Sequence, residues 1–271
     1  MGTLKLPRVK LSRPDQKRVA ILHARGTNRD REAFLACDVA GGDPEYVLVT
    51  DLLSGQKNLM DYHMVLLPGG FSHGDDLGAG VIWSVTMQQG LDGSLARFAD
   101  DGRPLLGICN GFQVLIKAGL LPGADFLRNG KRSVTLTHND SGRFECRWVY
   151  LRSNRNSPSL FTRKVSDLIL CPVAHGEGRV AVADEATGQA LWDAQLPALT
   201  YVDSSGQPVD YPGNPNGSVD GIAALTNPAG NVLGLMPHPE DHIFSWQHPR
   251  HYRKETGLSG LRLFENGIKS A

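Results

Sequence analysis

Short apolar runs alternate with a helical pattern through the first half of the chain. The runs lie at residues 19–22, 45–50, 63–70 and 104–109. Between the first two, the spacing of Phe34, Leu35 and Val39 predicts a helix that stops at a pair of glycines. Unbroken apolar runs of this length are typical of strands that are buried on both faces of a parallel sheet. The pattern therefore predicts an α/β fold with a mostly parallel sheet covered by helices.

The second half of the chain is richer in strand-like text. Apolar or alternating stretches occur at residues 133–138, 147–152, 168–176, 221–226 and 231–236. The last two flank a turn at residues 227–230 and predict a hairpin, and residues 259–270 predict a closing helix. The Pro/Gly/Asn-rich stretch 203–218 is expected to be a surface loop. We interpret residues 1–17 as an N-terminal arm and residues 18–271 as one domain with an added β-rich portion in its second half.

Composition and charge narrow the function classes. Lys plus Arg and Asp plus Glu each number 28, so the formal net charge is zero, and neither nucleic acid nor a membrane surface is expected as a partner. The sequence contains no uninterrupted apolar stretch of about 18 residues, and we expect a cytoplasmic protein. The cysteines stand far apart and form no CxxC pair, which disfavours disulfides and zinc; they are Cys37, Cys109, Cys146 and Cys171.

Cys109 lies between an apolar run and a predicted helix, in the stretch "GICNGFQVL". Gly107 and Gly111 permit a tight turn there, and Gly119 would end the helix. A strand-to-helix turn of this kind resembles a nucleophile elbow with sulfur in place of oxygen. The helix N-terminus would favour the thiolate, and its free N–H groups could hold an oxyanion. A small buried apolar side chain explains Cys109 equally well.

A general base for such a thiol is available in "MPHPED". Pro239 disfavours the helical region for His238, so residues 238–240 should run extended, with His238 and Glu240 on the same side. Imidazole and carboxylate could then pair. Two alternatives remain: a metal site built from His238, Asp241, His242 and His248, which Pro239 disfavours, or histidines on a surface loop.

The stretch "LLPGGFSHGDD" forms a third loop at a strand end. Its glycines allow backbone to approach a ligand, and one of their N–H groups could be a second oxyanion donor, although an ordinary tight turn explains them nearly as well. We expect Asp75 or Asp76 to cap a helix over residues 77–90, in preference to binding Mg²⁺. The sequence has no G-x-x-x-x-G-K-[ST] phosphate loop, so no ATP-binding site is expected in this chain.

Together these motifs resemble the class I, triad-type glutamine amidotransferases. "GTNRD", "GGFSHGDDLGAG", "NDSGRFECRWV", "PVAHGEGR", "NPNGS" and "GLMPHPE" resemble in particular the glutaminase subunits of phosphoribosylformylglycinamidine synthase. The resemblance runs from about residue 18 to the end of the chain. It implies a flavodoxin-like three-layer α/β/α domain with the added β-rich portion.

The resemblance also implies roles for individual residues. Cys109 would be the nucleophile, His238 the base and Glu240 its orienter. The backbone N–H groups of Gly70 and Asn110 would bind the oxyanion, and Gln113 would lie near the substrate glutamine. No metal or cofactor is implied in this chain.

Partners follow from the same resemblance. Ammonia would pass to a large synthetase subunit that carries ATP and Mg²⁺, often with a small third subunit. In "AHGEGR", His175, Glu177 and Arg179 are candidate contacts to another subunit, unless this segment is only a solvated turn. Another intracellular cysteine hydrolase, such as a peptidase, and a catalytically silent binding subunit remain as alternative functions.

The chain departs from the family pattern at several places. His73, Asp76 and Gly78 replace the residues usual in the family's glycine loop, which puts side-chain contacts from that loop in doubt. The N-terminal arm, residues 185–212 and residues 245–257 look longer than in compact family members. These segments would contact partners or be inert.

Overall fold

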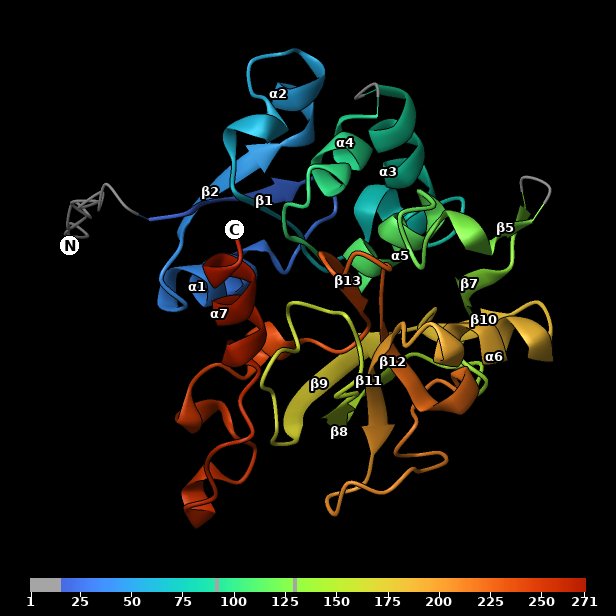
Figure 1. The fold of residues 1–271 in the computed structure, drawn as a ribbon. Coiled ribbons are helices and arrows are strands. Elements are labelled where there is room, and N and C mark those ends of the chain that lie inside the picture. Colours follow the sequence, from blue (N-terminus) through green and yellow to red (C-terminus); the bar gives the residue numbers. More distant parts are fainter. Residues whose placement is uncertain (1–15, 91–92, 129–130) are drawn as a thin grey trace, which may run out of the picture.

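The computed structural model describes residues 16–90, 93–128 and 131–271. A nine-stranded sheet runs through its centre in the order β2-β1-β3-β4-β13-β12-β11-β8-β9 (Figure 1). Most of the predicted arm, residues 1–15, lies outside the described residues. Gln16 and Lys17 contact the start of β2: the Gln16 amide donates to the carbonyl of Gly41, and the carbonyl of Lys17 accepts from the N–H of Asp43.

The first five strands of this order are parallel. They are β2 (Asp43–Leu48), β1 (Arg18–His23), β3 (Met64–Leu67), β4 (Leu105–Ile108) and β13 (Val232–Leu235). All residues of β3, β4 and β13 are buried, as expected for strands covered on both faces. The order 2-1-3-4 followed by a fifth strand is that of flavodoxin-like sheets, which bind ligands beyond the carboxyl ends of the strands. The predicted α/β fold is confirmed.

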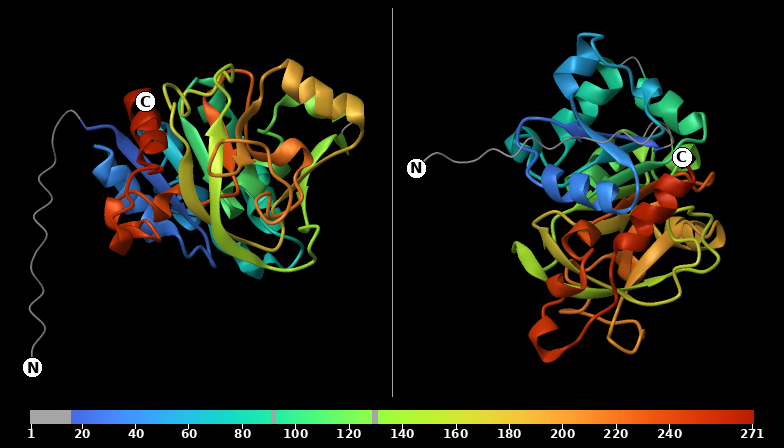
Figure 2. Two further views of the ribbon diagram at one scale, coloured as in Figure 1. Left: turned by 90° about the horizontal axis from the view of Figure 1, so that it is seen from below. Right: turned by 90° about the vertical axis from the view of Figure 1, so that its left-hand side faces the viewer.

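Helices cover both faces of the parallel part (Figures 1 and 2). On one face lie α1 (Asp30–Val39) and α7 (Leu261–Lys269), which contact each other. On the other face lie α3 (Val81–Val85), α4 (Ser94–Asp100) and α5 (Asn110–Lys117). The described helices include none that is long and apolar enough to cross a membrane. The three-layer arrangement places α5, whose residues 110–116 are all buried, against the centre of the sheet.

The β-rich half extends the same sheet with antiparallel strands. These strands are β12 (Ile222–Thr226), β11 (Pro197–Val202), β8 (Glu145–Ser153) and β9 (Ile169–His175). Two small sheets pair β7 (Val134–Thr137) with β10 (Arg179–Val182) and β5 (Leu127–Arg128) with β6 (Lys131–Arg132). The predicted β12–β13 hairpin is present. Because β13 also pairs with β4, the added portion is a continuation of the central sheet.

Residues 185–212 belong to this framework and are not an appendage. They contain α6 (Glu185–Asp193) and β11, which lies between β12 and β8 in the middle of the antiparallel part. One-turn 3-10 segments occupy Leu59–Asp61, Ser72–Asp75, Ala124–Phe126, Val219–Gly221, Pro239–Asp241, Ser245–Gln247 and His251–Arg253.

Two predicted boundaries are wrong. The run at residues 45–50 ends as a strand at Leu48 and turns into α2 (Val49–Leu53), because Val49 and Leu52 are buried at helical spacing. The helix expected over residues 77–90 begins only at Val81, after Gly80 in a left-handed conformation (φ 73°), and continues as a π-helix over Thr86–Gly90. Asp75 and Asp76 therefore do not cap it.

Candidate active site

Cys109 occupies the turn between β4 and α5. Its backbone has φ 50° and ψ −105°, a region that a non-glycine residue adopts only when its surroundings enforce it. The N–H of Cys109 donates to the carbonyl of Leu235 on β13 (2.7 Å), and its own carbonyl accepts from the N–H of Gln113 (3.1 Å). The side chain is 6% exposed. The predicted elbow is present, and it fixes the sulfur at the carboxyl edge of the sheet.

The two glycines beside the cysteine serve packing and not the turn itself. Neither Gly107 nor Gly111 has a positive φ. A Cβ on Gly111 would come within 2.0 Å of the carbonyl oxygen of Leu67, and one on Gly107 within 2.7 Å of the carbonyl oxygen of Gly111. The glycines thus let α5 approach β3 and β4 closely, while Cys109 itself adopts the strained conformation.

His238 and Glu240 follow β13, the strand next to β4. His238 Nδ1 lies 2.7 Å from Glu240 Oε1, and both side chains are almost fully buried. The backbone is not extended as predicted, because Pro239–Asp241 forms a 3-10 turn. The non-helical conformation expected for the residue before proline does hold at His238 (φ −106°, ψ 83°). This turn places the Glu240 carboxylate next to the His238 imidazole.

The other ring nitrogen of His238 faces the cysteine side of the site. Burial alone would lower the pKa of His238, but the Glu240 carboxylate and the Cys109 sulfur outweigh burial and raise this pKa well above its usual range. Nε2 is buried and makes no hydrogen bond of ordinary geometry to any described residue, but it lies close enough to the Cys109 sulfur for the two to interact. Catalytic hydrogen bonds are often long before substrate binds. The arrangement suits an imidazole that receives the thiol proton.

Gly69 lies between His238 and Cys109, a feature that the sequence did not predict. A Cβ at this position would come within 2.7 Å of His238 Cε1 and 3.4 Å of Cys109 Cβ. Any side chain here would therefore push the imidazole away from the sulfur. The available signal was the doubled glycine of "PGG", of which only Gly70 was given a role.

The predicted oxyanion donors both border Cys109. Gly70 (φ 150°) lines the same pocket as the sulfur, and Asn110 begins α5, where the first N–H groups of a helix have no partners within it. The loop that carries Gly70 is held from the β1 side, because the N–H of Phe71 donates to the carbonyl of Gly26 (3.0 Å) and the N–H of Arg29 to that of Gly69 (3.2 Å).

A small pocket opens above Cys109. Its volume is about 130 Å³, and Cys109, Gln113 and His175 are among the residues that line it. Phe71 and Phe144 also line the pocket; they are 47% and 53% exposed, and their ring centroids lie 6.3 Å apart. A pocket of this size suits one small polar side chain, since sites for drug-sized ligands are typically about 300–1,000 Å³.

Gln113 and the "AHGEGR" segment form one wall of this pocket. The Gln113 amide nitrogen donates to the carbonyl of Glu177 (2.6 Å), and the Glu177 carboxylate accepts from the N–H of Ala79 (3.3 Å). Arg179 forms an ion pair with Asp140. His175 is 3% exposed, which disfavours its predicted contact with another subunit. Burial and the nearby His238 lower the pKa of His175 to about 3, so it stays neutral.

The three residues that depart from the family's glycine loop lie outside the pocket, and two of them have an unusual backbone conformation. His73 (φ 54°) and Gly78 (φ 100°) both adopt left-handed backbone conformations. Gly78 can do so without strain, and Asp76 is exposed, with its carboxylate beside Gly74. None of the three lines the pocket.

The residues of the metal-site alternative do not form a metal-binding group in the described part of the chain. The described residues contain no group of three or more His, Cys, Asp or Glu side chains that could hold a metal ion. His238 is paired with Glu240, and His242 Nδ1 lies 2.5 Å from the carbonyl oxygen of Leu170. His242 and His248 pack edge to face, with ring centroids 5.6 Å apart, but His238 is paired with Glu240 and does not join them.

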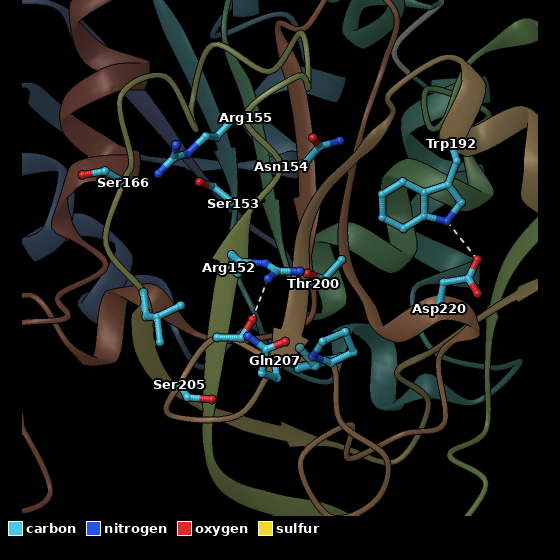
Figure 3. Close-up of a pocket in the computed structure, with 14 residues that line it drawn as sticks. Arg152, Ser153, Asn154, Arg155, Ser166, Trp192, Thr200, Ser205, Gln207 and Asp220 are labelled. Atoms are coloured by element: carbon cyan, nitrogen blue, oxygen red, sulfur yellow. Dashed lines mark hydrogen bonds between the residues drawn. The ribbon is translucent and has the colours of Figure 1, made fainter.

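A larger cavity lies away from this site. Its volume is about 630 Å³, and it lies around Arg152, near the end of β8 (Figure 3). The Cys109 pocket instead borders Phe144, which precedes β8. The Trp192 indole donates to Asp220 (2.8 Å) and the Arg152 guanidinium to the carbonyl of Gly206 (2.6 Å). Its 14 lining residues include no Cys, His or Glu, so it offers neither a thiol nor an imidazole.

Known proteins resemble this chain in both sequence and structure. Residues 16–270 match the family of CobB/CobQ-like glutamine amidotransferase domains. Phosphoribosylformylglycinamidine synthase subunit PurQ of Treponema denticola is 38% identical over 266 residues, which cover 93% of this chain and 97% of the relative. The PurQ subunit of Picrophilus torridus is 40% identical over 260 residues, covering 93% and 99%. A chain in the structure of PurLQS from Thermotoga maritima shares 32% identity with a TM-score of 0.70, covering 94% and 98%.

Fold and comparisons agree on the class of protein: the chain is a glutamine amidotransferase of the CobB/CobQ-like kind. The relatives named PurQ match over nearly the whole of both chains. The chain therefore belongs to the PurQ family, the glutamine amidotransferase subunits of phosphoribosylformylglycinamidine synthase. The resemblance inferred from the sequence motifs is confirmed.

Proposed function

We propose that this chain hydrolyses the side-chain amide of glutamine at Cys109 and passes the ammonia to a synthetase that makes formylglycinamidine ribonucleotide in purine biosynthesis. The observation that carries the proposal is the elbow cysteine beside a buried His238–Glu240 pair, on neighbouring strands, under a pocket of about 130 Å³. The small pocket favours an amino-acid side chain over a polypeptide, which disfavours the peptidase alternative.

The chemistry proceeds in two steps. The Cys109 thiolate attacks the amide carbon, the carbonyl π bond opens onto the oxygen, and the N–H groups of Gly70 and Asn110 stabilise the oxyanion. His238, protonated and oriented by Glu240, gives its proton to the departing nitrogen, so ammonia leaves and a thioester remains. His238 then takes a proton from water, the hydroxide adds to the thioester, and glutamate leaves as the thiolate is restored. Gln113 would orient the bound substrate.

The partner would supply what this chain lacks. A large synthetase subunit would bind ATP and Mg²⁺, and a small third subunit would complete the assembly. The names of the relatives and the PurLQS neighbour support a synthetase partner. Ammonia must reach that partner unprotonated, because ammonium has no free electron pair. Phe71 and Phe144, exposed at the pocket, and the partly exposed Glu177 and Arg179 are candidate contacts around the exit.

Labelling and turnover together test the proposal. A glutamine-analogue electrophile should modify Cys109 once per chain and spare the other thiols, because burial raises the pKa of Cys37 and of Cys171 and neither lines the pocket. The exposed Cys146 is the internal control. Ammonia release from glutamine should be low for the chain alone and rise when a PurL-type synthetase with its nucleotides is added. Labelling that persists in Cys109→Ala, or no glutamine-dependent ammonia with the synthetase present, would refute the proposal.

A further inference from the structure

The side chain of Asn110 joins two parts of the pocket that the backbone leaves separate. It is 1% exposed, and its oxygen accepts the N–H of Ser72 (3.3 Å). Its amide nitrogen donates to Gln113 Oε1 (2.9 Å) and to Asp75 Oδ1 (3.4 Å). Because a backbone N–H can only donate, the oxygen end of the amide must face Ser72. One side chain thus bonds both α5 and residues 69–76, the glycine loop.

The glycine loop needs such an anchor. Three consecutive residues, His73 (φ 54°), Gly74 (φ 71°) and Asp75 (φ 54°), lie in the left-handed region, which is costly for the two that are not glycine. On its β1 side the loop is held by hydrogen bonds from Phe71 and His73 to Gly26 and Arg25. On its α5 side the Asn110 amide contacts Ser72, which precedes the left-handed residues, and Asp75, which is the last of them.

The hydrogen bonds continue to the opposite wall. Gln113, held by Asn110, donates to the carbonyl of Glu177, and Glu177 in turn accepts from the N–H of Ala79, just beyond the glycine loop. The resulting chain of hydrogen bonds links residues that line the pocket above Cys109, among them Gln113, Glu177 and Ala79. Asn110, the first residue of α5, is the one that contacts both the glycine loop and Gln113, one turn further along the helix.

We propose that the Asn110 side chain is a positioning residue that fixes the N–H of Gly70 relative to the Cys109 sulfur, so that both oxyanion donors face the same oxygen. This inference rests on the proposed glutaminase function. Gly70 is anchored on the β1 side, where it bridges Thr27. A loop released at Ser72 and Asp75 would therefore be held from that side alone, and this donor would lose its fixed position relative to α5. Asn meets the site's demand for one acceptor and two donors, whereas Asp supplies only acceptors and would face the oxygens of Asp75 and Gln113.

The test compares two reactions of the same thiol in Asn110→Asp. Glutamine hydrolysis, measured as ammonia release with the synthetase present, develops an oxyanion; alkylation of Cys109 by iodoacetamide, measured by mass spectrometry, does not. We expect kcat for glutamine to fall by about 10- to 100-fold, the order of loss produced by a misplacement of about 1 Å, with a smaller change in KM. The alkylation rate should stay within about twofold of wild type, because the nucleophile and base are untouched.

Asn231→Asp is the matched control. Asn231 is 3% exposed and donates to the carbonyls of Ala99 and Arg103, but it lies before β13, at the strand end opposite the site. The Asn231→Asp variant should be less stable than wild type but should not show the selective loss of kcat for glutamine. Should Asn110→Asp not fold, Asn110→Ser, which is neutral and too short to span the gap, should show the same selective loss.

Two results would separate the failures. A wild type that releases no ammonia with synthetase, while Cys109 still reacts with iodoacetamide, would refute the glutaminase function itself. The positioning role alone would be refuted if the wild type is active and the Asn110 variants that fold keep kcat within about twofold of it. It would also be refuted if Asn231→Asp showed the same selective loss of kcat.

Discussion

At Cys109 a costly backbone conformation coincides with the proposed chemical use. A residue held in such a region costs of the order of 1–3 kcal/mol, which the surrounding structure must offset. The hydrogen bond from its N–H to Leu235 ties the turn to β13, the strand from whose end His238 projects. The same contact that enforces the conformation therefore also sets the distance between sulfur and imidazole.

Glu240 is expected to act through His238. In Glu240→Gln the imidazolium loses its buried counter-charge, so the pKa of His238 should fall and kcat should drop on the order of 100-fold, with KM nearly unchanged. The loss should be smaller than in Cys109→Ala. Steady-state kinetics and an NMR titration of the His238 ring would measure both effects. An increased KM at normal kcat would instead assign Glu240 to substrate binding.

The sequence was sufficient to predict where residues lie when their placement depends on their own segment. Cys109, His238 and Glu240 each follow an apolar run, and parallel strands bring such ends to one edge of the sheet. The roles of Gly69 and of the Asn110 side chain depend on contacts between segments far apart in the chain, which no local pattern contains. His175 was misplaced for the same reason: its burial comes from neighbours such as Asn139 and Gly178.

At the scale of elements, the close approach of α5 to β3 is open to a direct test. A Cβ in Gly111→Ala would overlap the carbonyl of Leu67, which is backbone and cannot yield easily, so we expect destabilisation by about 1–3 kcal/mol and a loss of glutaminase activity. Gly188→Ala in α6 is the control, because its Cβ would lie 3.8 Å from Val182. Removing a helix-interior glycine there should stabilise by about 0.5–1 kcal/mol. Denaturant unfolding of both variants checks the pair of signs.

A second test concerns the edge formed by β2 and β1. Partial burial would raise the pKa of Glu45, but hydrogen bonds from Lys57, Tyr62 and Arg18 outweigh it and lower this pKa to about 2. A lowered pKa in the folded state stabilises above the unfolded value of about 4.3, and this contribution disappears as the pH falls toward 2.

Glu45→Gln should therefore destabilise at pH 7, by roughly 1 kcal/mol because the group is partly solvated, and the difference from wild type should shrink below about pH 4. Thermal unfolding of both proteins across this pH range measures it. An equal difference at pH 7 and pH 3 would show that packing, not charge, is what Glu45 contributes.

Elements were predictable where a run was uniformly apolar. The strands β1, β3 and β4 and the β12–β13 hairpin consist mostly of buried residues, and the apolar runs in the sequence predicted these elements. The helix α6 escaped notice because Gly188 interrupts it and its buried residues are few. The late start of α3 reflects Gly78 and Gly80, whose left-handed backbone turns the chain before the apolar residues begin to repeat.

On the scale of the whole molecule, one sheet unites the two halves of the chain. The parallel half carries the thiol, while the antiparallel half supplies Phe144 and His175 to the pocket and, through the β12–β13 hairpin, positions the base. Phe71 and Phe144, one from each half, are exposed at the pocket. A partner that covers this pair would contact both halves at once and could thereby influence the site from outside.

The adjacency of β4 and β13 also dictates when the enzyme comes into existence during synthesis. Cys109, the proposed nucleophile, is translated in the first half of the chain, but the strand that pairs with β4, and the His238 behind it, are translated near the end. Until then β4 lacks its β13 neighbour, and the thiol has neither its base nor the Leu235 carbonyl that holds its turn. With the proposed roles of Cys109 and His238, a nascent or truncated chain cannot consume glutamine, and reactivity arises only in a chain that is almost complete.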